Sequence, residues 1–250
     1  MEFFGREEYL DKLDALWRKR ASSLVVVSGR RRIGKSTLVE EFARRSGCTF
    51  IEIAGLPPEK KMTNARQLEN FCERLAHATG LPEPKADCWA KAFDALASAV
   101  RSCERTIVFL DEISWMGRYD PAFAGFLKNA WDMQLSKKSR LILVVAGSVS
   151  AWIHANIQHG KGFVGRLSLD ITLPELPARD CLAFWGRKLA RTARIGDSVV
   201  EEVRQKVVRL ALPKSKSVKT VLVYDGELDP SVEENDFFDY LIPAEKLLVR

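Results

Sequence analysis

The fold is decided by residues 24–36, LVVVSGRRRIGKS, where a β-branched apolar run leads directly into a loop bounded by glycines. The part from Gly29 to Ser36 fits the pattern GxxxxGK(S/T). A short, continuous apolar run is typical of a parallel strand buried on both faces. Residues 36–45 continue at helical spacing. The stretch therefore predicts a strand, a P-loop and a helix in that order.

This loop has the chemistry that nucleotide phosphates require. Two glycines let the backbone amides point inward, and the helix N-terminus adds the positive end of its dipole. Lys35 supplies a cation for the β- and γ-phosphates, and Ser36 offers a hydroxyl to Mg²⁺. The three arginines inside the loop either lie in solvent or contact phosphate. The predicted nucleotide-binding residues here are Gly29, Arg30, Arg31, Arg32, Ile33, Gly34, Lys35, Ser36 and Thr37.

A second apolar run, residues 107–110, ends in two carboxylates, Asp111 and Glu112. A Walker B segment has this form, because its first acid holds hydrated Mg²⁺ and its second orients the attacking water. A helix cap at the end of a strand is the alternative interpretation. The position downstream of a P-loop favours Walker B. We therefore expect Ser36 and Asp111 to be metal ligands and Glu112 to be the catalytic base.

Two further residues are catalytic candidates. Ser148 ends the next strand, which in such sheets lies between the two strands already named, so it can approach the γ-phosphate or the water. It also suits the N-cap of a helix over residues 149–157, and the two roles are compatible. Arg166 follows a glycine-bearing loop and is expected either to reach a phosphate, in the same chain or across subunits, or to be an ordinary surface charge.

Strand and helix patterns alternate along the first two thirds of the chain. Strands are predicted at residues 24–27, 49–53, 106–110, 141–146 and 167–173, and helices at residues 6–19, 36–45, 65–78, 90–100 and 122–135. Crossover connections of this length predict an α/β fold, a P-loop NTPase with a five-stranded parallel sheet flanked by helices. After Pro174 we predict helices at 178–191 and 199–210, a strand at 218–224, and a helical or irregular tail at 237–248 whose Pro243 starts or interrupts a helix.

Composition narrows the functional classes. The chain has 250 residues, 46% of them hydrophobic, which excludes a disordered or collagen-like protein. A net charge of +6 favours polyanionic partners without identifying one. The five cysteines form no CxxC pair, which predicts reduced thiols. We expect a cytoplasmic protein with no membrane partner, since the sequence contains neither a signal peptide nor a long apolar run.

Several motifs occur in one order along the chain: FFGREE (residues 3–8), GRRRIGKS, FLDE, AGS and FVGRL (residues 163–167). This order resembles the prokaryotic, often archaeal, AAA+-related ATPases of the STAND type that carry a C-terminal restriction-endonuclease-like domain. The resemblance covers about residues 1–192. It implies ATP and Mg²⁺ as cofactors. It also implies that Phe4, Gly5 and Arg6 lie against the nucleotide base or sugar, with Arg6 a candidate phosphate ligand.

The same resemblance implies a shortened protein. Residues 176–187 resemble the start of a helical lid that ends near Arg191, and residues 198–248 resemble the last part of the nuclease fold. We therefore expect an ATPase core at 1–176, a truncated lid at 177–195 and a nuclease-like α/β remnant at 196–250. The Glu-x-Lys matches of the chain, at 59–61 and 83–85, fall in loops of the ATPase half, so we predict no nuclease activity.

Three functional hypotheses follow. The leading one is Mg-dependent ATP hydrolysis with low turnover, used as a nucleotide-driven switch. The second is a non-enzymatic nucleic-acid-binding module that uses the basic loops with Lys214, Lys216 and Lys219. The third is an idle remnant of a larger ATPase. The output, the oligomeric state and any protein partner are left open by the sequence.

Overall fold

The computed structural model describes most of the chain in two units. The described residues are 3, 5–19, 21–102, 104–148, 151–160, 162–176, 180, 196, 198–209, 219–224, 227–243 and 246. One unit is Arg6–Glu175, and the other combines Met1–Gly5 with Leu176–Arg250. The predicted helix at 178–191 and almost all of the predicted lid at 177–195 lie outside the described residues, as does Phe4.

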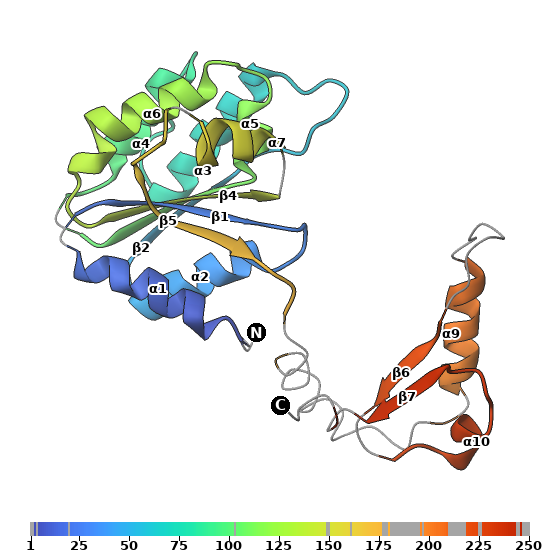
Figure 1. Cartoon of the computed structure of the whole chain (residues 1–250). Helices are drawn as coiled ribbons and strands as arrows, with labels where there is room; N and C mark the ends of the chain where they lie inside the picture. Colours follow the sequence, from blue (N-terminus) through green and yellow to red (C-terminus); the bar gives the residue numbers. More distant parts are fainter. Residues whose placement is uncertain are drawn as a thin grey trace. The chain divides into compact units, whose positions relative to one another are not determined.

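The larger unit contains a five-stranded parallel sheet in the order β2-β3-β4-β1-β5 (Figure 1). The strands are β1 (Ser23–Gly29), β2 (Thr49–Ala54), β3 (Thr106–Asp111), β4 (Leu141–Ser148) and β5 (Leu167–Leu173). The expected fold class is confirmed. Strand β4 lies between β1 and β3, as expected, so the carboxyl ends of these three strands meet at one edge of the sheet.

Helices cover both faces of this sheet (Figure 1). Two of them, α1 (Glu7–Arg18) and α2 (Lys35–Ser46), lie on one face. The other face carries α3 (Asn64–Thr79), α4 (Trp89–Ala99), α5 (Ile113–Gly117), α6 (Phe123–Met133) and α7 (Ala151–Ile153). A 3₁₀ turn, η1 (Leu135–Lys137), follows α6, and a π-helical turn, η2 (His154–Gln158), follows α7. Helix α7 and most of the π-helical turn fall within the helix predicted over residues 149–157, whereas helix α5 was not predicted from the sequence.

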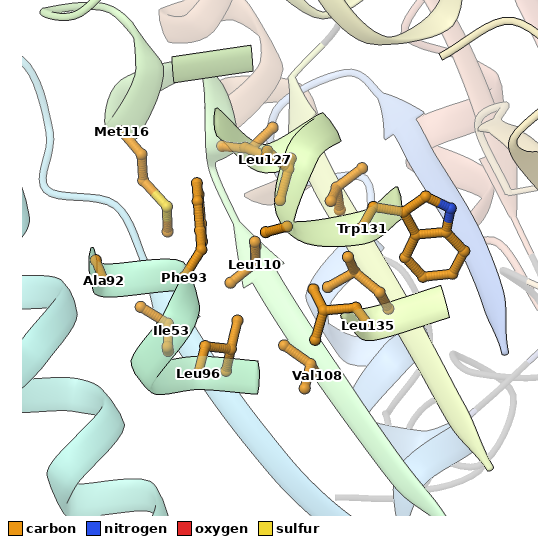
Figure 2. Close-up of a cluster of buried hydrophobic side chains, with 14 of the residues drawn as sticks. Ile53, Ala92, Phe93, Leu96, Val108, Leu110, Met116, Leu127, Trp131 and Leu135 are labelled. Atoms are coloured by element: carbon orange, nitrogen blue, oxygen red, sulfur yellow. The ribbon is translucent and has the colours of Figure 1, made fainter. Parts of the chain in front are cut away.

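Burial on both faces explains why the central strands form. Every residue of β1 is buried, as is every residue of β4 before Ser148. Figure 2 shows Phe93 of α4, Leu110 of β3 and Leu127 of α6 among the side chains of the core between sheet and helices. Trp89 and Phe123 add an edge-to-face contact with ring centroids 4.7 Å apart. This packing fixes the strand ends relative to one another.

The smaller unit consists of α9 (Ser198–Arg209), β6 (Val221–Tyr224), α10 (Pro230–Glu233) and β7 (Tyr240–Pro243). Its two strands are parallel, and its buried core is formed by Val200, Leu228 and Val232. Its description as a nuclease-like remnant stays a prediction. Within the described residues of the whole chain, no helix combines the length and the apolarity that a membrane span requires.

The tail differs from its predicted structure. Residues 240–243 form strand β7 instead of a helical or irregular segment. The reason is that Tyr240, Leu241 and Ile242 favour extended backbone and find a partner in β6. Pro243 is the last residue of this strand, a position where its missing N–H costs little, so it does not interrupt a helix.

Candidate functional site: a P-loop at the carboxyl edge of the sheet

The loop between β1 and α2 requires both of its glycines. Gly29 has a φ of +153°, and a Cβ there would lie 3.0 Å from the carbonyl oxygen of Leu173 and 3.1 Å from Cγ2 of Ile33. Gly34 has a φ of +93° and is the N-cap of α2. Such backbone is costly for any residue with a side chain. The glycines thus let the loop fold tightly against β5 and lead into the helix.

Lys35 is oriented by the loop itself. Its side chain is buried, with a residue exposure of 5%, at the first position of α2. Its Nζ donates to the carbonyl oxygens of Gly29 at 3.3 Å and Arg30 at 3.1 Å. An ammonium group has three donors. The ammonium group is therefore held at the N-terminus of α2. An anion bound there would be stabilised both by the charge of Lys35 and by the helix dipole.

Two of the three loop arginines, Arg30 and Arg31, have partners outside the loop. Arg30 forms an ion pair with Glu175 at 2.6 Å, and both side chains are largely exposed. Arg31 stacks over the ring of Trp115, with its guanidinium carbon 5.8 Å from the centroid. Arg32 is exposed and has a φ of +63°. Exposed pairs of this kind contribute little to stability, so these side chains can exchange their contacts for phosphate.

The carboxyl end of β3 meets the start of α2. The Ser36 hydroxyl donates to Oδ2 of Asp111 at 2.7 Å, while Oδ1 of Asp111 accepts the backbone N–H of Glu112 at 2.8 Å. Both carboxylate oxygens are thereby oriented. The two residues predicted to hold a metal lie within hydrogen-bond distance of each other, although they are far apart in the sequence.

Glu112 occupies strained backbone beside Ser148. Its φ and ψ are 47° and 47°, the left-handed region that a glutamate rarely adopts. Its Oε1 accepts the Ser148 hydroxyl at 3.4 Å, and its Oε2 accepts the Ser148 backbone N–H at 3.5 Å. At the neighbouring Gly147, a Cβ would lie 2.4 Å from Cδ1 of Ile153 and in ordinary contact, at 3.8 Å, with Oε2 of Glu112. The structure thus brings together Glu112 and Ser148, two of the three predicted catalytic residues, at this edge.

One carboxylate near this edge was missed by sequence reasoning. Glu52 lies on β2, next to β3, and burial raises the pKa of its carboxyl group, with added repulsion from Glu40 and Asp111. The signal was available in the sequence, because a lone acid within the apolar strand Thr49–Ala54 is unusual. Glu52 is therefore a further acidic group on the strand next to that of Asp111.

Arg6 connects the loop to the end of β5. It is buried and has a φ of +65° at the N-cap of α1. Its Nη2 donates to the carbonyl oxygens of Pro174 at 2.6 Å and Ile33 at 3.5 Å. This gives Arg6 a structural role at the loop, and its predicted contact with the nucleotide stays a prediction, as does that of Gly5. Phe4 lies outside the described residues.

Arg166 lies at the opposite edge of the sheet. It precedes β5, and the start of β5 pairs with the start of β1. A strand of this length spans roughly 20 Å. Its Nε and Nη2 donate to the two carboxylate oxygens of Asp132 at 2.7 and 2.9 Å. The prediction of a phosphate contact within the same chain is therefore wrong, because Arg166 sits at the amino end of its strand and is held by α6.

Strand β1, the glycine-bounded loop and helix α2 form a P-loop. Its Ser36 is hydrogen-bonded to Asp111 at the end of β3, and β4 lies between β1 and β3. This arrangement defines a P-loop nucleotide-binding protein. The chain belongs to the AAA ATPase domain family, whose sequence model matches residues 2–144. A comparison with curated protein sequences gives no match.

Solved structures share this fold at low sequence identity. One is the ORC2 protein of Aeropyrum pernix in ADPNP–ADP complexes, with 17% identity and a TM-score of 0.55 over 76% of this chain and 52% of that chain. A Walker-type ATPase of Pyrococcus abyssi has 18% identity and a TM-score of 0.56 over 75% and 58%. The ORC1 protein of Aeropyrum pernix, in complex with DNA, has 15% identity and a TM-score of 0.53 over 84% and 56%. The chain thus spans little more than half the length of each of these proteins.

Proposed function

We propose that this chain binds Mg-ATP and hydrolyses it slowly, as a nucleotide-driven switch. The observation that carries the proposal is the 2.7 Å hydrogen bond between Ser36 and Asp111. It joins the first turn of the P-loop helix to the strand-end acid, which is the pairing that a metal-bound nucleotide phosphate requires. Lys35, buried in the same loop, is the cation for the β- and γ-phosphates.

The residues at this edge fit the two cofactors. A serine hydroxyl and a carboxylate are the hard oxygen ligands that Mg²⁺ prefers, and Glu52 is a further acidic group on the neighbouring strand. Gly34 has open space where a side chain would begin, so its backbone can approach a phosphate. When bound, Mg²⁺ would neutralise charge that develops on the phosphates.

Glu112 and Ser148 are the proposed hydrolytic pair. Glu112 orients the attacking water and accepts its proton, while Ser148, in contact with Glu112 at 3.4 Å, reports the γ-phosphate. The left-handed backbone of Glu112 supports a functional role, because strain of this kind persists at sites where the side chain is needed. Low turnover is expected from a shortened lid, since closure over the nucleotide excludes water.

The proposal also covers the type of ATPase and its location in the cell. We infer a STAND-type ATPase of the cytoplasm, from the order of its motifs, with a nuclease-like remnant that has no nuclease activity. The ADPNP–ADP complexes of the Aeropyrum pernix ORC2 protein support an adenine nucleotide as the ligand. An idle remnant is less favoured, because the strained Glu112 would serve no purpose in it.

Calorimetric titration of Mg-ATP, followed by phosphate release on the same samples, tests the proposal. We expect the wild type to bind and Lys35→Ala to lose binding. Phosphate release is expected from the wild type and not from Glu112→Gln, which keeps binding. Absence of Mg-ATP binding by the wild type would refute the proposed function, while equal release from Glu112→Gln would remove only the assignment of the base.

A further inference from the structure

A basic hollow lies at the edge of the sheet opposite the P-loop. Its volume is about 480 Å³, and its charged lining residues are Arg18, Lys19, Arg105 and Arg140. Three segments contribute them: the end of α1, the residue before β3 and the residue before β4. Strand β1 begins at this edge and ends at the P-loop, so the two sites are separated by roughly the length of a strand, about 20 Å.

The four cations share this hollow with no acid from the described part of the chain. Among the described residues, no carboxylate lines the hollow and none of the four side chains forms an ion pair. The contrast with other basic residues is clear, because the nearby Arg101 pairs with Glu104 at 3.1 Å. Like charges gathered in this way repel one another, and a polyanion relieves the repulsion.

Arg105 is held in position by an aromatic stack. Its guanidinium carbon lies 5.4 Å from the centroid of the Trp17 ring. Trp17 is itself fixed, since it stacks on Phe42 with centroids 6.1 Å apart and its Nε1 donates to Ser46 Oγ at 3.1 Å. A guanidinium anchored on an aromatic face keeps its N–H donors free for a planar, bidentate contact with phosphate.

The helix dipole accounts for only part of this cluster. Cations in the last turn of α1 are stabilised by its carbonyl end, which explains Arg18 and Lys19. Arg105 and Arg140 precede strands and gain nothing from a helix terminus. The helix dipole therefore does not explain why these two arginines converge on the same hollow.

We propose that this hollow binds the phosphodiester backbone of a nucleic acid. Arginine forks suit phosphate oxygens, and none of the described large apolar side chains that are exposed, as a membrane-inserting surface needs, lines the hollow. Trp17 is engaged on Phe42 and Arg105, so the site reads the backbone and not the bases. The proposal is independent of ATP binding, which uses the opposite edge of the sheet.

The salt dependence of binding to a labelled DNA duplex of about 20 base pairs tests this proposal. Four phosphate contacts give a slope of log K against log salt of about −3.6, or roughly a 150-fold loss of affinity between about 50 and about 200 mM salt. The variant R105Q/R140Q removes two contacts, which halves the slope to about −1.8 and the loss to about 12-fold. Fluorescence anisotropy measures both.

Matched variants locate the binding. K85Q/K91Q removes two exposed charges from another surface and is expected to leave the slope unchanged. Lys35→Ala is also expected to leave it unchanged, which excludes the P-loop as the site of the duplex. R140Q alone is expected to reduce the slope by about 0.9, and it keeps the proposal testable if loss of the Arg105 stack disturbs folding.

Three results would overturn the proposal. The first is an equal change of slope in K85Q/K91Q and R105Q/R140Q, which would indicate a general charge effect. The second is no binding of the duplex at low salt. The third is binding to vesicles containing phosphatidylserine, without binding to the duplex. None of these results bears on Mg-ATP affinity, so failure here is distinguishable from failure of the proposed ATPase.

Discussion

The hydroxyl of Ser36 donates a 2.7 Å hydrogen bond to Oδ2 of Asp111. One residue lies in the first turn of α2 and the other at the end of β3, and β4 and β1 set the distance between these elements. Because the central strands are buried on both faces, this distance is fixed by the core and not by the site. The sheet thus preorganises two oxygen ligands for one cation.

A double-mutant cycle is expected to show that these two residues act as a unit. Ser36→Ala and Asp111→Asn should each weaken Mg-ATP binding, and the double variant should lose less than the sum of the two. A coupling energy of about 0.5–3 kcal/mol is typical of residues that share a partner. Calorimetry in Mg²⁺ measures the cycle. Additive losses would show that the residues do not share a ligand.

Backbone strain at Glu112 predicts a trade between stability and activity. Glu112→Gly is expected to be more stable than Glu112→Ala by about 1 kcal/mol, because glycine adopts the left-handed region without cost. Both variants should lose phosphate release by at least about 100-fold if Glu112 is the base. Chemical denaturation and phosphate release measure the two effects.

Gly147 offers a separate test, of the packing beside Glu112 and Ser148. Gly147→Ala is expected to destabilise the protein, because its Cβ would lie 2.4 Å from Cδ1 of Ile153. If Glu112→Gly and Glu112→Ala were equally stable, the left-handed backbone would not be strained in solution.

Arg6 is expected to couple the P-loop to β5. Its bonds to the carbonyl oxygens of Ile33 and Pro174 cannot be reproduced by a lysine, whose ammonium lacks the reach and shape of a guanidinium. We therefore predict that Arg6→Lys lowers both the melting temperature and the affinity for Mg-ATP. Arg30→Lys, at an exposed ion pair, is the matched control and should change stability little.

The elements that were predicted correctly are those whose sequence pattern fits only one kind of structure. Strand β5 has its predicted bounds, and the glycines of the P-loop have the backbone angles that the motif requires. Helix α5 was missed because five residues are too few to show helical spacing. Strand β7 was missed because a four-residue strand depends on its partner β6, which is distant in the sequence.

The position of Arg166 could have been deduced. It directly precedes a predicted strand of a parallel sheet, so it must lie at the amino edge, whereas the P-loop follows its strand and lies at the carboxyl edge. The order of the motifs suggested that Arg166 contacts a phosphate of the same chain, but the direction of β5 excludes this contact. The side-chain geometry around Glu112 was not predictable, because the contact with Ser148 depends on the left-handed backbone of Glu112.

The Asp132–Arg166 pair predicts a pH dependence of stability that is independent of the nucleotide. Arg166, with help from Lys128, lowers the pKa of Asp132 from 3.8 to about 2. A depressed carboxyl pKa stabilises the fold above the unfolded value, so Asp132→Asn should cost about 1 kcal/mol near neutral pH. This difference should shrink as the pH falls from about 4 to about 2. Mg-ATP affinity should be the same in both proteins, and a loss of affinity in Asp132→Asn would contradict the assignment of this pair to the far edge of the sheet.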